Sequence, residues 1–214
     1  MPTALTPSKI VCVGRNYLEH AKELGNEVPA EPLLFLKPPS SLVGDGDAIV
    51  LPAASERVEH EGEIGILIGA RLRDADEATC TRAVAGIVAL NDVTARDLQR
   101  RDSQWTRAKG FDTFCPVGVV HAGPVNLGAL EVACHVNGEE RQRGRSADMA
   151  FPIPFLLSYI SRIMTLEPGD LVATGTPAGV GPLRPGDRVE VEVVGLSRVT
   201  NVVRQAEHRP GNPG

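Results

Sequence analysis

The chain of 214 residues is long enough to bury a substantial hydrophobic core in one large domain or two small ones. Hydrophobic residues make up 42% and charged residues 23% of the composition, which is typical of a soluble globular protein. The formal net charge is -5 and no lysine- or arginine-rich stripe is present, so we expect no nucleic acid as a partner. The longest apolar runs are too short to span a bilayer, so we expect no membrane association.

Cysteine usage and the N-terminal segment favour a cytoplasmic location. The cysteines at positions 12, 80, 115 and 134 are widely spread and include no Cys-x-x-Cys pair, which argues against zinc and thioredoxin-like chemistry. Residues 1–9 lack a basic region followed by an apolar one, so we expect no secretory signal.

Apolar and β-branched runs predict more strands than helices, with irregular spacing and no βαβ alternation. The expected strands cover residues 9–13, 33–36, 48–51, 58–69, 85–90, 130–136, 171–174, 188–194 and 198–204. The expected helices cover residues 16–24, 75–84, a segment after Thr94, and an apolar segment at 152–164 that packs centrally or against a partner subunit. We therefore predict one β-rich α+β domain over residues 1–206 and a flexible tail at 207–214.

Two local signals mark element boundaries. Thr94 followed by Asp97 resembles a capping box, so we expect Thr94 to cap a helix that carries Gln99. Asn137-Gly138 follows an alternating run and predicts a tight β-hairpin.

Residues 58–69 carry the main site prediction. The second half of this stretch is continuously apolar, which predicts a strand buried on both faces. Residues two apart in a strand share a face, so Glu61 and Glu63 are expected to project side by side at the margin of the core. Two adjacent carboxylates at such a place need a solvated edge, a shared proton or a cation.

A third carboxylate, Asp92, follows the apolar strand at 85–90. If the two strands are neighbours, Glu61, Glu63 and Asp92 converge, and three oxygen ligands suit a hard cation such as Mg2+ or Mn2+. The alternative for Asp92 is a helix cap before Thr94.

His20 and Glu23 are three residues apart on an expected helix. They could form a general-base pair in which the carboxylate orients the imidazole. The alternative is an exposed polar pair of little energetic consequence.

Three basic residues and one glycine-rich loop could bind an anionic ligand. Arg15, Lys37 and Lys109 could each bind a carboxylate or stabilise an enolate, and the alternative for each is a solvated surface position. The loop at 174–181 lacks the Gly-Lys-Ser/Thr of a Walker A motif, but it can offer backbone N–H groups and the Thr176 hydroxyl to an anion.

The order of these motifs resembles the fumarylacetoacetate hydrolase family in its short, single-domain form, over residues 9–204. The motifs that carry the resemblance are Val13-Gly14-Arg15-Asn16-Tyr17, His20 with Glu23, Phe35-Leu36-Lys37-Pro38, His60-Glu61-Gly62-Glu63, Asn91-Asp92-Val93-Thr94-Ala95-Arg96-Asp97, Lys109-Gly110-Phe111-Asp112 and Thr174-Gly175-Thr176-Pro177-Ala178-Gly179-Val180-Gly181.

The resemblance implies a mixed β-sandwich roll, a homodimer, and a divalent metal, Mg2+ or Mn2+, held by Glu61, Glu63 and Asp92. It also implies roles for further residues. These are water activation by His20 and Glu23, contact with the reacting carbonyl by Lys109 and Gln99, and substrate binding by Arg15, Lys37 and Thr176.

For the substrate, the resemblance implies a small 2-oxo or 2,4-diketo acid. We favour hydrolysis of the C–C bond of an acylpyruvate because both His20 and Glu23 are present. The same enolate forms in oxaloacetate decarboxylation, and a related dienolate forms in the isomerisation of a dienol. The remaining alternative is a non-catalytic scaffold that binds a metal or another ligand.

Overall fold

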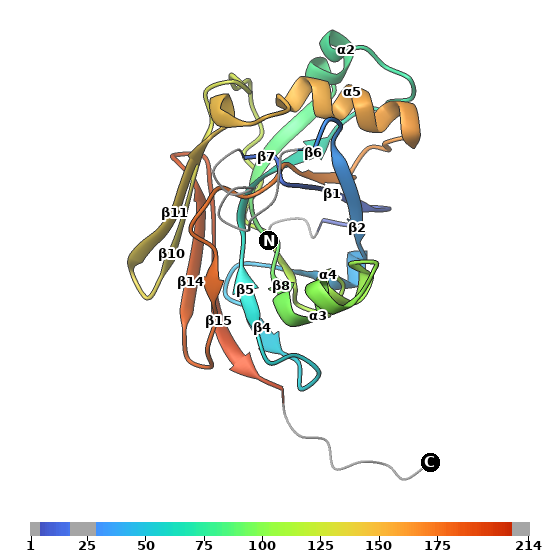
Figure 1. Ribbon diagram of the computed structural model, residues 1–214. Coiled ribbons are helices and arrows are strands. Elements are labelled where there is room, and N and C mark those ends of the chain that lie inside the picture. Colours follow the sequence, from blue (N-terminus) through green and yellow to red (C-terminus); the bar gives the residue numbers. More distant parts are fainter. Residues whose placement is uncertain (1–4, 18–28, 207–214) are drawn as a thin grey trace.

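The computed structural model describes residues 5–17 and 29–206 (Figure 1). The strands are β1 (Ile10–Gly14), β2 (Leu33–Lys37), β3 (Leu42–Val43), β4 (Ala48–Leu51), β5 (Val58–His60), β6 (Gly62–Ile68), β7 (Val84–Asn91), β8 (Thr94–Ala95), β9 (Cys115–Pro116), β10 (Glu131–Val136), β11 (Glu139–Arg145), β12 (Leu171–Ala173), β13 (Gly181–Pro182), β14 (Arg188–Val193) and β15 (Ser197–Gln205). The helices are α2 (Glu77–Arg82), α3 (Arg96–Arg101), α4 (Thr106–Lys109) and α5 (Ile153–Ile163), with 3-10 turns η1 (Pro39–Ser41) and η2 (Ser146–Asp148).

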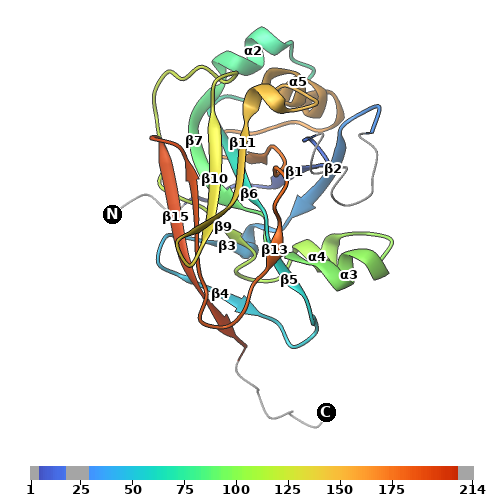
Figure 2. The same ribbon diagram turned by 60° about the vertical axis from the view of Figure 1, so that its left-hand side comes forward.

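Two five-stranded sheets form the body of the structure. The first has the order β2-β1-β12-β6-β7 and the second the order β11-β10-β14-β15-β4. Strands β6 and β7 contact β10, β14 and β15, so the sheets pack face to face over a shared core, as Figures 1 and 2 show. A three-stranded sheet, β13-β5-β8, lies beside them. The strand-rich α+β prediction is confirmed.

The central strand β6 is buried on both faces, as its apolar sequence predicts. Ile64 and Ile66 point into the core between the sheets. On the opposite face Leu67 packs on a second, smaller cluster built from β1, β7 and β12. Antiparallel pairing with β7 places Gly62 opposite Asn91. The beginning of β6 and the end of β7 therefore lie side by side.

The hairpin at Asn137-Gly138 is also confirmed. Both residues have positive φ, 55° and 82°, and they join β10 to β11. A two-residue turn with both φ values positive matches the right-handed twist of the strands, and asparagine followed by glycine adopts it most readily.

Helix α5 packs inside the chain, together with α2, at one end of the sandwich (Figure 1). Its buried side includes Ile153, Leu157 and Ile160. The Ser158 hydroxyl donates to the Ala75 carbonyl at 2.8 Å and fixes the helix to the segment before α2. Contact of this helix with a partner subunit stays a prediction. Within the described ranges, no helix is long and apolar enough to cross a membrane.

Two expectations about local structure are wrong. Thr94 does not cap a helix, because it lies in β8 opposite Glu59 and α3 begins after Ala95 without a side-chain cap. The Asp97 carboxylate instead accepts hydrogen bonds from the Ser55 hydroxyl and the Glu56 N–H, so a tertiary contact replaces the expected local one. The adjacent Gly110 also predicts a loop around Lys109, but Lys109 lies at the end of α4.

The expected helix at 16–24 lies largely outside the described residues. Of its first two residues, Asn16 is not helical and Tyr17 forms an isolated bridge with Met149. The tail at 207–214 lies outside the described residues as well.

Candidate active site

The stretch of alternating acids is interrupted at Glu61, where one continuous strand was expected. Strand β5 ends at His60 and belongs to the three-stranded sheet, while β6 begins at Gly62 in the first large sheet. Asn91 and Asp92 hold the junction, since the Glu61 N–H donates to Asn91 Oδ1 at 3.0 Å and the Asp92 N–H donates to the Glu61 carbonyl at 2.8 Å. The backbone thereby ties the end of β7 to the acidic stretch.

Three carboxylates meet at this junction. Glu61, Glu63 and Asp92 each offer an oxygen, and these oxygens all lie within 4.8 Å of one another. The three residues are only 5%, 2% and 1% exposed. The solvated edge considered for Glu61 and Glu63 is thus excluded by their burial, and Asp92 does not cap a helix.

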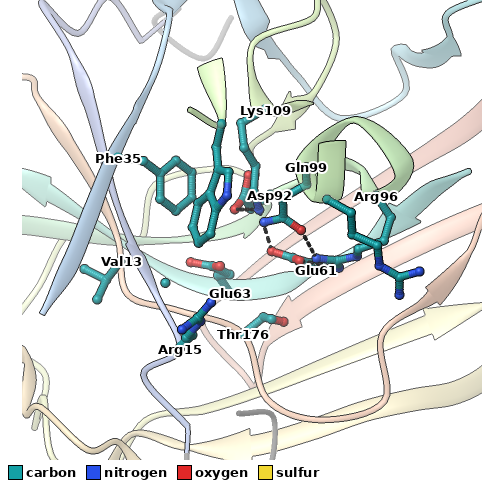
Figure 3. A pocket seen from close by; sticks show the side chains of 13 residues that line it. Val13, Arg15, Phe35, Glu61, Glu63, Asp92, Arg96, Gln99, Lys109 and Thr176 are labelled. Carbon is teal, nitrogen blue, oxygen red and sulfur yellow. Dashed lines mark hydrogen bonds and ion pairs between the residues drawn. The ribbon is translucent and has the colours of Figure 1, made fainter. Parts of the chain in front are cut away.

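Three basic side chains neutralise part of this charge. The Lys109 ammonium donates to Glu61 Oε2 at 2.8 Å and to Asp92 Oδ2 at 2.5 Å (Figure 3). The Lys37 ammonium donates to Asp92 Oδ1 at 2.7 Å. These contacts engage both carboxylate oxygens of Asp92.

Arg96 connects Glu61 to a fourth acid, Glu59. Its guanidinium donates to Glu61 Oε1 at 2.5 Å and to Glu59 Oε2 at 2.7 Å. Although burial opposes it, Arg96 together with Arg57 lowers the pKa of Glu59, so this carboxylate is charged. Arg96 also donates to Gln99 Oε1 at 2.5 Å, which orients that amide at the site.

Of the four clustered acids, Glu63 is the one with no cationic partner among the described residues. Within the described ranges, Lys37, Lys109, Arg96 and the half-exposed Arg57 form ion pairs with the other three acids. No basic side chain in the described ranges forms an ion pair with Glu63, whose Oε2 accepts the Gly175 N–H at 2.8 Å. Burial, followed by repulsion from Asp92 and Glu61, raises the pKa of Glu63 well above its ordinary value.

The donor set therefore fits a hard divalent cation. All three donors are carboxylates, as Mg2+ and Mn2+ prefer, and an added cation would balance the charge of Glu63. Gly175 completes this side of the site with φ of +101°, and a Cβ there would lie 2.7 Å from the Asn16 Cβ. Only glycine allows the backbone N–H to approach Glu63 in this way.

A pocket of about 270 Å³ opens over the carboxylates. It is lined by Val13, Gly14, Arg15, Phe35, Glu61, Glu63, Asp92, Arg96, Gln99, Arg100, Trp105, Lys109 and Thr176. Figure 3 shows Lys109 and Arg15 on opposite sides of Glu63. The structure thus brings Arg15, Gln99, Lys109 and Thr176 together with the three acids.

Two of these residues are held in unusual ways. Arg15 has φ of +59°, a conformation that costs energy for a non-glycine residue and that concentrates at functional sites. The Thr176 hydroxyl donates to the Gly62 carbonyl at 2.9 Å and accepts from Gln142 Nε2 at 2.7 Å. Because both contacts are buried, Thr176 has a defined orientation at the wall of the pocket.

Lys37 does not line the pocket. Its ammonium is buried and donates to Asp92 and to the Val93 carbonyl at 3.1 Å, so the geometry favours support of Asp92 over contact with a substrate. The predicted pair of His20 and Glu23 lies outside the described residues, and its role stays a prediction.

Sequence reasoning missed Arg96, Glu59 and Gln142 as parts of the site. For Glu59 a signal was available, since acids occupy positions 59, 61 and 63 in alternation. Arg96 and Gln142 carried no such signal, because their partners lie 35 and 34 residues away in the chain.

The fold and the acidic pocket define a β-rich protein with a buried cluster of carboxylates that could hold a metal ion. The family model described as "Fumarylacetoacetate (FAA) hydrolase C-terminal" matches residues 9–204. The chain therefore belongs to the fumarylacetoacetate hydrolase family, whose members are enzymes.

Three similar proteins carry different activities in their names. "Oxaloacetate decarboxylase, mitochondrial" from Dictyostelium discoideum is 46% identical over 198 residues, covering 89% of this chain and 91% of the relative. The structure of 2-hydroxyhepta-2,4-diene-1,7-dioate isomerase from Mycobacterium marinum has a TM-score of 0.86 at 43% identity, covering 94% of this chain and 76% of the other. Fumarylpyruvate hydrolase from Pseudomonas aeruginosa, in complex with Mn2+ and pyruvate, has a TM-score of 0.90 at 30% identity, covering 96% and 93%.

Proposed function

We propose that this protein is an enzyme that converts a small 2-oxo acid through its enolate and that depends on a divalent metal ion. Glu61, Glu63 and Asp92 would hold the ion, Mg2+ or Mn2+, and the bound ion would supply Lewis-acid chemistry. The observation that carries the proposal is the convergence of three buried carboxylates within 4.8 Å beside an open pocket and the Lys109 ammonium.

Lys109 is the residue we assign to the developing negative charge. Burial alone would lower its pKa, but Asp92 and Glu61 raise it, so the ammonium stays charged across the physiological range. Its Nζ lies 4.9 Å from the centre of the Phe35 ring, and its carboxylate contacts fix its direction. A preorganised, buried positive charge stabilises an enolate oxygen more than it stabilises the neutral ketone.

Substrate orientation falls to Arg15, Gln99 and Thr176. All three line the pocket. Arg15 and Gln99 carry N–H donors, whereas the Thr176 hydroxyl already donates to the Gly62 carbonyl and shapes the wall of the pocket. Arg96 holds the Gln99 amide oxygen, so the amide N–H groups are left to face a ligand.

The first reaction we propose is hydrolysis of an acylpyruvate. Water adds to the distal carbonyl, the C3–C4 bond breaks, and its electron pair becomes the pyruvate enolate, which then takes up a proton at C3. His20 and Glu23 supply the base for the water in this scheme. The fumarylpyruvate hydrolase structure with Mn2+ and pyruvate supports both the metal and the 2-oxo acid.

The second candidate is decarboxylation of oxaloacetate or isomerisation of a dienol. A relative at 46% identity is named an oxaloacetate decarboxylase, and a structure at 43% identity is named an isomerase of a heptadienedioate. Neither reaction needs an activated water, so both could proceed with the described residues alone. Oxaloacetate and the 1,7-dioate each carry a carboxylate at both ends.

The test is turnover of acetylpyruvate, oxaloacetate and a hydroxymuconate-type dienol by the purified protein, with Mg2+, with Mn2+ or with EDTA. We expect metal-dependent turnover of at least one substrate and its loss in Glu61→Gln. Absence of metal-dependent turnover of all three would support the non-catalytic scaffold instead.

His20→Ala separates the two candidate reactions. If His20 activates water, this variant loses far more activity on acetylpyruvate than on oxaloacetate. Equal losses on both substrates would contradict the water-activating role. The assembly we propose is a homodimer, which the molar mass measured by light scattering on a sizing column will check.

A further inference from the structure

Two arginines at the pocket have no ion-pair partner among the residues that the structure describes. Arg15 lies at the end of β1 and Arg100 on α3, and both line the pocket over the carboxylates. Among residues 5–17 and 29–206, neither guanidinium makes a hydrogen bond or an ion pair. An unpaired guanidinium offers five donors in a planar fork that matches a carboxylate.

Arg100 differs in this respect from the other arginines of its neighbourhood. Arg96 pairs with Glu59 and Glu61, while Arg101 and Arg107 both pair with Asp102. Acids are therefore present around α3 and α4, and they pair with the other three arginines but not with Arg100.

The position of Arg100 relative to Arg96 places it at the outer part of the pocket. Residues four apart share one face of a helix, and four residues advance about 6 Å along its axis. Arg96 is buried against Glu61, whereas Arg100 is exposed. A molecule that reaches the three carboxylates with one end therefore directs its other end toward Arg100.

Arg15 contributes from a different wall. Its strained backbone, with φ of +59°, directs the side chain into the pocket, and Figure 3 shows it on the opposite side of the carboxylates from Gln99. The Trp105 ring packs on the preceding Gly14, where a Cβ would lie 3.1 Å from Cζ3. Trp105 also meets Phe35 edge to face, with ring centroids 5.3 Å apart, so two aromatic rings form this side of the pocket.

We infer that Arg15 and Arg100 form a subsite for a second carboxylate, so that the pocket selects dicarboxylic 2-oxo acids over monocarboxylic ones. This inference rests on the proposed function, because it assumes that the 2-oxo acid end occupies the metal side. Arg100 is the specificity-determining residue of the subsite, and Arg15 contacts the ligand from the wall that follows β1.

The test uses pairs of ligands that differ only in the terminal group. 2-Oxoglutarate is compared with 2-oxopentanoate, and 2-oxoadipate with 2-oxohexanoate, by calorimetric titration in the presence of Mg2+ or EDTA. We expect the wild-type protein to bind at least one of the two dicarboxylates roughly tenfold more tightly than the monocarboxylate of the same chain length. The expected factor is small because an exposed charge-assisted hydrogen bond contributes modestly to binding. In Arg100→Gln the preference falls to about twofold while affinity for the monocarboxylates is kept.

Arg101→Gln is the matched control, because it makes the same charge change at the adjacent residue, which does not line the pocket. It should keep the full dicarboxylate preference. Equal loss of preference in both variants would indicate a general electrostatic effect and would overturn the subsite. The subsite would also be overturned if Arg100→Gln lowered the affinity for a dicarboxylate and for the matching monocarboxylate by the same factor.

The same titrations distinguish failure of the proposed function from failure of the subsite. If no 2-oxo acid binds in a Mg2+-dependent manner, the enolate proposal itself is wrong. If monocarboxylates bind with Mg2+ but the wild-type protein shows no dicarboxylate preference, the enolate proposal stands and the subsite does not.

Discussion

Replacing Glu63 by glutamine should make the metal-free protein more stable. In the structure this carboxylate is buried, has no ion-pair partner among the described residues, and lies beside Glu61 and Asp92. The substitution keeps the shape of the side chain and removes its charge. Glu61→Gln makes the same chemical change at a carboxylate that Arg96 and Lys109 hold at 2.5 and 2.8 Å, so it should destabilise the metal-free protein by about 3 kcal/mol or more.

With the metal bound, we expect the wild-type protein to become more stable than Glu63→Gln. A ligand present at one hundred times its dissociation constant stabilises the native state by about 2.7 kcal/mol. For a chain of 214 residues this corresponds to a rise in the melting temperature of roughly 5–11 °C. Wild-type protein should show this rise with Mg2+ or Mn2+ over EDTA. Both variants should lose most of it because each replaces a charged carboxylate ligand by a neutral amide.

The pH dependence follows from the raised pKa of Glu63. The native state then binds this proton more tightly than the unfolded state, whose glutamate pKa is about 4.3. In EDTA this group therefore contributes a stability that falls as pH rises above about 4.3, until the folded-state pKa is passed. Glu63→Gln lacks this loss, so its advantage over wild type should grow with pH in that window.

The measurement is thermal unfolding of the three proteins, with Mg2+ and with EDTA, at several pH values between 4 and 8. The reasoning would be refuted if Glu63→Gln were as destabilised as Glu61→Gln in EDTA at pH 8.

Three further outcomes are expected. Glu59→Gln should weaken Mn2+ binding about tenfold, because it releases Arg96 from its ion pair. Arg57→Gln is the control: Arg57 is a half-exposed partner of the same acid, so its loss should change Mn2+ affinity little. Titration calorimetry measures both affinities. Lys109→Met should lower kcat by about 10²–10³-fold with a native circular dichroism spectrum, and activity near wild type would exclude its electrophilic role. Cys115 and Cys134 are buried, which raises the pKa of each thiol to about 12, so the native protein should leave both unreactive toward a thiol reagent at pH 8 until it is unfolded.

Much of the strand pattern could be predicted because it is encoded locally. The apolar run of β6 and the Asn137-Gly138 turn each carry their signal within a few residues, and both appear where expected. The capping role predicted for Thr94 was wrong because a long-range contact replaces the local one. The Asp97 carboxylate accepts hydrogen bonds from a segment about forty residues away, and a local sequence pattern cannot reveal such donors.

For the site, the sequence by itself determined the three carboxylates, since two alternate along one stretch and the third follows a buried strand. Only the tertiary structure decided how their charge is balanced. Lys37 and Arg96 reach acids that are 55 and 35 residues away, at positions set by the registers of the sheets. Because an ion pair depends on atomic distance and not on spacing along the chain, the lone position of Glu63 could be seen only after the strands were brought together.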